Sequence, residues 1–400
     1  MSVTRRTRII ISIAMIGLLF SSVLIGGIAW VSLRIYRWRT DPHTVVLINA
    51  KDGKAVRRLI SDGAPVCAGI TQDGRLLAVM TGDGRLELWQ LPQGKLLRAV
   101  KTRMRDLRWG GDLRFSPDGQ FIEADGRQAG VGLWRVQDLH ELRIPLAGAG
   151  PPVAWSPYGN MLAVAVNTDQ DIGSVKFIRT EDLKVIRTLV PGEGRIEQVE
   201  FSPNGRLLAV SYSGSDNGVA IWWLMDWRLI KTFPTHKEPG GFAFTSNGAM
   251  LAAAGNDLKL LDGSTLMPIR TLKGYSLYNR SQWYRHMQFS SDGALLACDY
   301  TPHSGPDAGH PKVRIWSVTG KDPICTLDGG LAWSVPPFVF LPGNRLLVMA
   351  EGRNRSTFSC WQFPGRKLLY GTSEISIPQR YMAASPDGRL IAIGPAILGD

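Results

Sequence analysis

The chain has 400 residues, 44% of them hydrophobic, and 46 Lys and Arg against 34 Asp and Glu give it a formal net charge of +12. The apolar content excludes an intrinsically disordered chain, 20% charged residues are too few for a coiled coil, and four cysteines exclude a small disulfide-rich protein. Six arginines and no acidic residue lie within residues 1–40, which leaves 40 basic against 34 acidic side chains, a surplus of 6, in the other 360 residues. That small surplus is dispersed along the chain, so we expect no nucleic-acid partner.

An uncharged segment near the N-terminus predicts a membrane anchor. Ile9 to Leu33 is a run of 25 residues without a charged side chain, and at about 1.5 Å per residue it can cross a hydrocarbon core of about 30 Å. Arginines follow the run where small residues of a cleavage site would be expected, which favours an uncleaved signal anchor over a signal peptide. The expected organisation is a tail (1–8), a transmembrane helix (9–33), a linker (34–42) and one domain (43–400).

The positive charges on the two sides of this anchor are nearly balanced, so they hardly determine its orientation. Three arginines precede the helix and three follow it, so the positive-inside comparison is close to a tie. A short N-terminal tail before a large C-terminal domain favours an extracytoplasmic domain. A cytoplasmic domain is the alternative.

From residue 43 onward, a turn of the form S-P-D-G recurs, as in residues 116–119 and 202–205. The last residues of successive turns are separated by 45, 40, 46, 43, 45, 51 and 44 residues. A period of about 40–50 residues is expected for propeller blades of four strands each. These last residues are Gly74, Gly119, Gly159, Gly205, Gly248, Gly293, Asn344 and Gly388.

Each repeat contains a pattern for four strands. A short strand precedes the turn, as at 198–202, and an apolar run rich in Leu, Ala and Val follows it, as at 206–210. Nearly continuous apolar residues suit a strand that is buried on both faces. A third strand ends in a hydrophobic residue and Trp, as at 221–222, and a fourth alternates weakly, as at 184–189.

The two ends of the repeat region are complementary half-blades. Residues 44–60 match only a third and fourth strand, and residues 380–395 match only a first and second strand. Pairing them would close the ring and remove two exposed sheet edges. The sequence therefore predicts an all-β fold, a single eight-bladed β-propeller preceded by one transmembrane α-helix. A seven-bladed ring is the alternative, if the weak repeat at 120–146 merges with a neighbour.

This pattern resembles the WD40 family over about 355 of the 400 residues. The shared features are F-S-P-D-G before the second strand and the hydrophobic–Trp step in the third. The Trp is never followed by Asp, and the Gly-His dipeptide before the first strand is missing, so the family's His–Ser/Thr–Asp–Trp hydrogen-bond network is not expected. The S-P-D-G turns are also similar to those of periplasmic TolB-type propellers, which agrees with an extracytoplasmic location.

Residues with catalytic or metal-binding chemistry are sparse. No G-x-S-x-G, H-E-x-x-H or Walker motif occurs, so we expect neither catalysis nor a cofactor. His303, Asp307 and His310 share one loop and are candidates for a metal site, although their spacing fits no known motif and a solvated loop is the simpler interpretation. The four cysteines fall in predicted strands without a C-x-x-C motif, which indicates buried free thiols.

Long connections gather on one face of the expected ring. In a WD40-like propeller, the loops between second and third strands and those between blades share a face, which we call the loop face. The long loops of this chain are of these two kinds, and function tends to lie where insertions collect. Tyr, Trp and Arg are favoured at interface hot spots, although these aromatic residues could instead fill gaps between blades. The candidates for partner binding are Arg103, Arg105, Tyr275, Tyr278, Trp283, Tyr284, Trp333, Arg353 and Arg355.

The preferred hypothesis is a membrane-tethered, non-catalytic propeller that binds another protein through its loop face. The alternative is an extracytoplasmic enzyme or small-ligand-binding propeller with its site at the central channel. A chiefly structural role in envelope assembly is a third hypothesis.

Overall fold

A computed structural model describes most of the repeat region and none of residues 1–42. The chain divides into two units, residues 1–41 and 42–400. The predicted anchor at 9–33 therefore lies outside the described residues, and within them no helix is long and apolar enough to cross a membrane. The described residues are 43–49, 51, 55–104, 112–126, 130–144, 146, 149–167, 173–214, 217–235, 240–254, 257–273, 286–300, 312–328, 338–351, 356–371, 379–384 and 389–395.

In this part of the chain, 32 strands form eight four-stranded antiparallel sheets, the blades. Blade 1 is formed by β1 (Thr44–Asn49), β2 (Ala55–Ile60), β31 (Gln379–Ala384) and β32 (Leu390–Pro395), and blade 2 by β3 (Pro65–Ile70), β4 (Leu76–Thr81), β5 (Arg85–Gln90) and β6 (Lys95–Lys101). Blade 3 is formed by β7 (Leu113–Phe115), β8 (Phe121–Gly126), β9 (Gly130–Arg135) and β10 (Glu141–Leu142), and blade 4 by β11 (Ala149–Trp155), β12 (Met161–Asn167), β13 (Gly173–Arg179) and β14 (Val185–Leu189).

Blades 5 to 8 follow in chain order. Blade 5 is formed by β15 (Arg195–Phe201), β16 (Leu207–Ser213), β17 (Asn217–Trp223) and β18 (Arg228–Thr235), and blade 6 by β19 (Phe242–Phe244), β20 (Met250–Ala254), β21 (Leu258–Asp262) and β22 (Pro268–Leu272). Blade 7 is formed by β23 (Met287–Phe289), β24 (Leu295–Tyr300), β25 (Lys312–Ser317) and β26 (Pro323–Asp328), and blade 8 by β27 (Phe338–Leu341), β28 (Arg345–Glu351), β29 (Ser356–Gln362) and β30 (Lys367–Gly371).

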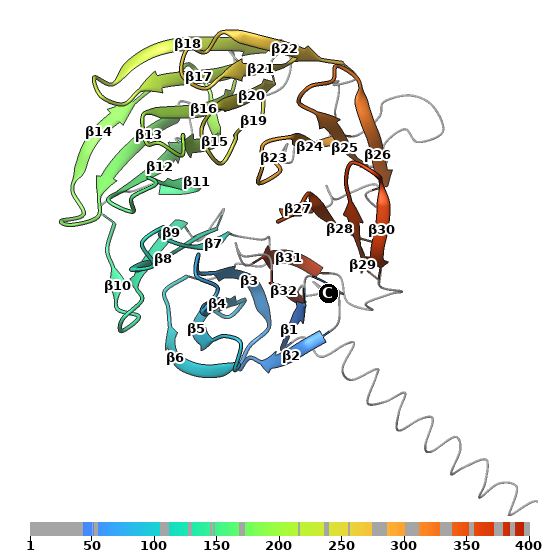
Figure 1. Cartoon of the computed structure of the whole chain (residues 1–400). Coiled ribbons are helices and arrows are strands. Elements are labelled where there is room, and N and C mark those ends of the chain that lie inside the picture. Colours follow the sequence, from blue (N-terminus) through green and yellow to red (C-terminus); the bar gives the residue numbers. More distant parts are fainter. Residues whose placement is uncertain are drawn as a thin grey trace, which may run out of the picture. The chain divides into compact units, whose positions relative to one another are not determined.

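The blades form a ring in which the first strand of each blade lies at the centre and the fourth at the periphery (Figure 1). The two half-blades pair as predicted: β1 lies beside β32 with Leu47 opposite Ala392, so blade 1 has the strand order β2-β1-β32-β31. The weak repeat at 120–146 forms blade 3, whose fourth strand, β10, has only two residues. The eight-bladed propeller is confirmed, and the seven-bladed alternative is wrong.

The turn between the first and second strands is held by a buried hydroxyl group. In blade 5, Ser202 Oγ accepts the N–H of Leu207 at 2.8 Å and donates to Asn204 Oδ1 at 2.7 Å. Gly205 closes this turn with a φ of 68°, which glycine adopts without strain. The hydroxyl group is thus fully hydrogen-bonded despite its burial. The same pair of bonds occurs at Thr71, Ser116, Thr245 and Ser290.

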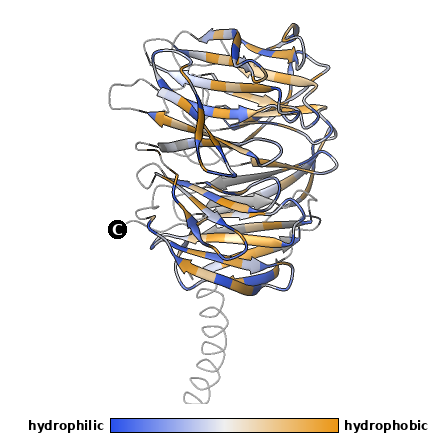
Figure 2. Cartoon of the chain, turned by 90° about the vertical axis from the view of Figure 1, so that its left-hand side faces the viewer, coloured by the Kyte–Doolittle hydropathy of each residue, from blue (hydrophilic) through white to orange (hydrophobic). Residues whose placement is uncertain are grey.

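The hydrophobic core lies between neighbouring blades. Side chains of the second strand, such as Ala163 and Leu208, are completely buried because they have a blade on either side. One cluster joins blades 4 and 5 around Phe177, Val210 and Trp222. Apolar residues accordingly run along the strands, and hydrophilic residues concentrate in the turns (Figure 2). The expected buried free thiols are present at Cys67, Cys298, Cys325 and Cys360.

Candidate functional site in the central channel

Most of the candidate residues taken from the sequence lie outside the described residues. Arg103 is described and is exposed. The remaining loop-face candidates, Arg105, Tyr275, Tyr278, Trp283, Tyr284, Trp333, Arg353 and Arg355, stay predictions, as do His303, Asp307 and His310. Where the chain is described, no group of three or more His, Cys, Asp or Glu residues is placed to hold a metal ion.

The innermost strands carry a ring of residues that sequence reasoning did not single out. We count back from the Ser or Thr that begins each S-P-D-G turn. Side chains two and four positions before it fall on the same side of an extended strand, because strand side chains alternate. Several of them, such as Arg114, Glu200 and Gln288, reach the following blade. In blades 2 to 7 the residues two before are Gly69, Arg114, Ala154, Glu200, Ala243 and Gln288, and those four before are Cys67, Asp112, Pro152, Gln198, Gly241 and His286. Charged or amide side chains two before the turn thus occur in blades 3, 5 and 7, and Gly or Ala in blades 2, 4 and 6.

Blade 5 uses these positions to bind blade 6. Gln198 Nε2 donates to Phe242 O at 2.9 Å, and Gln198 Oε1 accepts the N–H of Phe242 at 3.3 Å. The N–H of Phe244, two residues further along β19, donates to the carboxylate of Glu200. Two side chains of β15 therefore satisfy the backbone of β19 on the edge that points away from its own sheet.

Blade 7 binds blade 8 in a related way. Gln288 Oε1 accepts the N–H of Phe340 at 3.0 Å. The ring of His286 meets the ring of Phe338 edge to face, with centroids 4.6 Å apart. Burial lowers the pKa of His286, and the charge of Asp112 and a hydrogen bond to the Phe338 backbone oppose that shift. His286 is therefore neutral at pH 7.

Blade 3 binds blade 4 through an arginine. Arg114 Nη1 donates to Val153 O at 3.3 Å. The guanidinium also contacts Asp112 and lies 3.7 Å from Glu123 Oε2 and 3.8 Å from Asp125 Oδ2. One cation thus faces three carboxyl groups, two of which, Glu123 and Asp125, are buried.

Burial raises the pKa of several of these carboxyl groups, so they keep their protons to a higher pH than usual. Burial and the charge of Asp125 raise the pKa of Glu123 well above its usual value, against the opposing effect of Arg114. Neither oxygen of Glu123 has a hydrogen-bond partner. Burial also raises the pKa of Asp125 to about 6 and that of Glu200 to about 7. At neutral pH the channel is consequently less acidic than its carboxyl groups would suggest.

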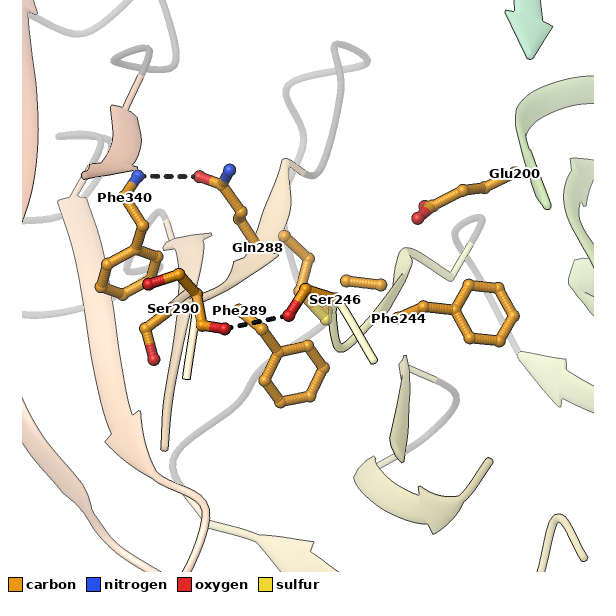
Figure 3. Close-up of a pocket in the computed structure, with 10 residues that line it drawn as sticks. Glu200, Phe244, Ser246, Gln288, Phe289, Ser290 and Phe340 are labelled. Atoms are coloured by element: carbon orange, nitrogen blue, oxygen red, sulfur yellow. Dashed lines mark hydrogen bonds between the residues drawn. The ribbon is translucent and has the colours of Figure 1, made fainter. Parts of the chain in front are cut away.

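A recess of about 310 Å³ lies at the boundary between blades 6 and 7. Figure 3 shows Glu200 of blade 5 across this recess from Gln288 of blade 7, with the rings of Phe244 and Phe289 lower in the view. It forms where Ala243 occupies the position that carries Glu200 in blade 5 and Gln288 in blade 7. A methyl group neither fills the space nor hydrogen bonds across the boundary.

The recess has a lining that is partly polar and partly apolar. Two of its three serine hydroxyl groups are engaged in the fold, because Ser246 Oγ donates to Ser291 O at 2.9 Å and Ser290 Oγ donates to Asp292 Oδ1 at 2.6 Å. Apolar walls with a few polar groups are typical of small ligand sites. The recess lies beside Ser246 and Ser291 of the S-P-D-G turns, on the face opposite the loop face, which we call the turn face.

A signal for this site was present in the sequence. The residue two positions before the Ser or Thr of each turn reads Arg, Glu and Gln in blades 3, 5 and 7, against Gly or Ala in blades 2, 4 and 6. An alignment of the repeats by their turns would have shown the alternation. Its meaning depends on contacts between residues 39 to 52 positions apart, such as Arg114 with Val153 and Gln288 with Phe340.

Comparisons with known proteins show which proteins this chain is similar to. A family model described as "WD domain, G-beta repeat" matches residues 183–222, which run from the fourth strand of blade 4 into the third strand of blade 5. The chain is 30% identical over 162 residues to WD repeat-containing protein AAC3 of Dictyostelium discoideum, covering 40% of this chain and 32% of that protein. It is 23% identical over 185 residues to THO complex subunit 3 of Arabidopsis thaliana, covering 46% of this chain and 56% of that protein.

The chain thus spans about a third to just over a half of the length of these curated relatives. A solved structure, the Dos1 propeller, is similar with a TM-score of 0.61, covering 89% of this chain and 95% of that chain at 13% identity, which shows the shared fold. The closed ring is that of an eight-bladed β-propeller, and residues 183–222 are similar to a WD repeat.

Proposed function

We propose that the chain is a membrane-tethered, non-catalytic platform that binds another protein through the loop face of its propeller. The observation that carries the proposal is the closed eight-bladed ring, whose turn face has short connections while the sequence places its long connections on the opposite face. A rigid ring that presents variable loops is a common arrangement for binding. The name of THO complex subunit 3, a relative, assigns that protein to a complex, which supports a protein partner for this chain.

The loop-face residues are the part of the proposal that can be tested by substitution. Replacing Tyr278, Trp283 and Arg353 together by Ala removes two aromatic anchors and one cation from the proposed interface. The matched control replaces Tyr158, Met225 and Arg206, which are exposed on the turn face. Proteins retained by the full-length chain are identified by quantitative mass spectrometry for each variant. A partner that is lost with the loop-face variant and kept with the control supports the proposal, whereas equal retention by both variants contradicts it.

The proposed membrane tether is the uncharged run of residues 9–33. The proposed location of the propeller is outside the cytoplasm. External protease added to intact cells or spheroplasts should digest the propeller if it is extracytoplasmic. Complete protection, with digestion only after the membrane is opened, would contradict the location. Release of the chain by carbonate washing would contradict the transmembrane anchor.

A further inference from the structure

The recess between blades 6 and 7 lacks a hydrogen bond that the adjoining boundaries possess. We infer that it binds the side-chain carboxamide of a glutamine or asparagine residue from a partner polypeptide. The inference rests on the proposed function only in that the occupant belongs to another protein. The site itself lies away from the loop face.

The backbone of β23 supplies the donor. The N–H of Ser290 donates to Leu295 O at 2.9 Å, within its own sheet. Because N–H groups along a strand alternate in direction, the N–H of Phe289 points away from β24, toward blade 6. The equivalent groups of blades 6 and 8, the N–H of Phe244 and of Phe340, donate to Glu200 and to Gln288 respectively.

Blade 6 cannot supply the matching acceptor. The residue of β19 at the position of Glu200 and Gln288 is Ala243, whose methyl group accepts no hydrogen bond. The resulting recess of about 310 Å³ has room for the side chain of a residue from another chain. An occupant with a carbonyl oxygen could accept the N–H of Phe289, as Gln288 Oε1 accepts the N–H of Phe340 in blade 8.

The other polar groups select a carboxamide over a charged group. Glu200 lies across the recess from Gln288 (Figure 3) and offers carboxyl oxygens as acceptors. A carboxamide has both the carbonyl oxygen that Phe289 requires and the NH₂ group that Glu200 can accept. A carboxylate would have only acceptors, and above about pH 7, where Glu200 loses its proton, it would also face a second negative charge. An ammonium group would have no acceptor for the N–H of Phe289.

The apolar walls set the shape of the site. Phe244, Met287 and Phe340 line the recess and are almost completely buried. They would contact the methylene groups of the occupant, and the polar groups would meet only its tip. This combination of apolar walls and a few directional polar groups is how small sites fix the orientation of a ligand.

The test uses a small probe in place of the unknown partner. The full-length chain is labelled with ¹³C at the methionine methyl groups, and N-acetyl-glutamine N-methylamide is titrated while the Met287 methyl resonance is followed. The equivalent glutamate compound is the chemical control. We expect a saturable shift of Met287 with the glutamine compound and a weaker response to the glutamate compound. Met80, which is buried between blades 2 and 3, should not respond.

Two substitutions test whether the Met287 response arises from this recess or from elsewhere in the ring. Ala243→Gln places an internal carboxamide in the recess, so it should abolish the Met287 response and raise the unfolding midpoint. Val339→Gln makes a similar change at the equivalent position of blade 8 and should leave the response intact. If Ala243→Gln does not fold, Ala243→Val, which narrows the recess, should produce the same loss.

Three results would overturn the inference: no saturable shift at Met287, an equal response to the glutamate compound, or a response that survives substitution of Ala243. Because the probe does not involve the loop face, its failure would leave the platform proposal standing. Loss of the platform proposal would likewise leave this measurement unchanged.

Discussion

The side-chain amide of Gln198 makes two hydrogen bonds to the backbone of Phe242 in the next blade, one of 2.9 Å and one of 3.3 Å. Innermost strands of neighbouring blades are not hydrogen-bonded to each other in a propeller, so their free edges face the channel. In this ring, side chains from blades 3, 5 and 7 reach those edges. These channel-facing side chains link blade 3 with 4, blade 5 with 6 and blade 7 with 8, while other contacts, such as that of Ser246 with Ser291, join the remaining boundaries.

Removing the Gln198 amide should destabilise the ring measurably. Gln198→Leu keeps the size of the side chain but loses both hydrogen bonds, and it leaves the N–H and C=O of Phe242 without their partner. At about 0.5–1.5 kcal/mol for each bond, the free energy of unfolding should fall by about 1–3 kcal/mol. Chemical denaturation measures the change. The control is Gln72→Leu, in an exposed turn, and a loss as small as that of the control would contradict the role of Gln198.

The stability of the ring should depend on the protonation of Asp125. Burial raises its pKa from 3.8 to about 6, partly offset by Arg114. The folded state therefore holds this proton more tightly than the unfolded state. The resulting stabilisation is complete below about pH 4 and is lost as the pH rises to about 6, at about 1.4 kcal/mol per pKa unit or about 3 kcal/mol in all.

Asp125→Asn tests this dependence because the amide has no proton to lose. Its Oδ1 can still accept the N–H of Asp112, which Asp125 accepts at 3.1 Å. Between pH 4 and about 6, the free energy of unfolding of the wild type should fall more steeply than that of the variant. Denaturation curves across this range provide the comparison, with Asp118→Asn in an exposed turn as the control. Parallel curves for wild type and Asp125→Asn would show that Asp125 does not carry the effect.

The fold could be predicted from the sequence because its signals are local. The turn at Ser202 and Gly205 specifies a hairpin by residue type alone, and the buried second strand follows it directly. The closure of the ring could also be predicted, since each half-blade lacks the strands that the other contains. Blade 3 was the weak point because β10 has only two residues.

The channel residues could not be assigned in the same way. Glu200 and Ala243 occupy equivalent positions in similar strands, and the sequence does not show that one binds the next blade while the other leaves a recess. That difference arises from contacts such as Gln198 with Phe242, 44 residues apart. The loop-face candidates such as Trp283 stay predictions.

A disulfide across the ring closure should stabilise the propeller strongly. Leu47 and Ala392 are direct partners on β1 and β32, and paired residues of antiparallel strands lie within disulfide range. Leu47→Cys with Ala392→Cys would close a loop of nearly the whole propeller, with an expected gain of about 3–5 kcal/mol over the reduced form of the same variant. Comparing oxidised with reduced protein cancels the cost of the cavity at Leu47. Equal unfolding midpoints for the two forms would contradict closure by these strands.

The most direct test of the pairing of blades is residue-resolved hydrogen exchange of the channel-facing amides. The N–H groups of Phe244 and Phe340 donate to Glu200 and Gln288, whereas that of Phe289, which by strand alternation points away from its own sheet, has Ala243 at the corresponding position. We predict that Phe244 and Phe340 exchange more slowly than Phe289 by about fivefold or more, as expected for one additional hydrogen bond. Exchange of Phe289 as slow as that of Phe244 and Phe340 would contradict the account.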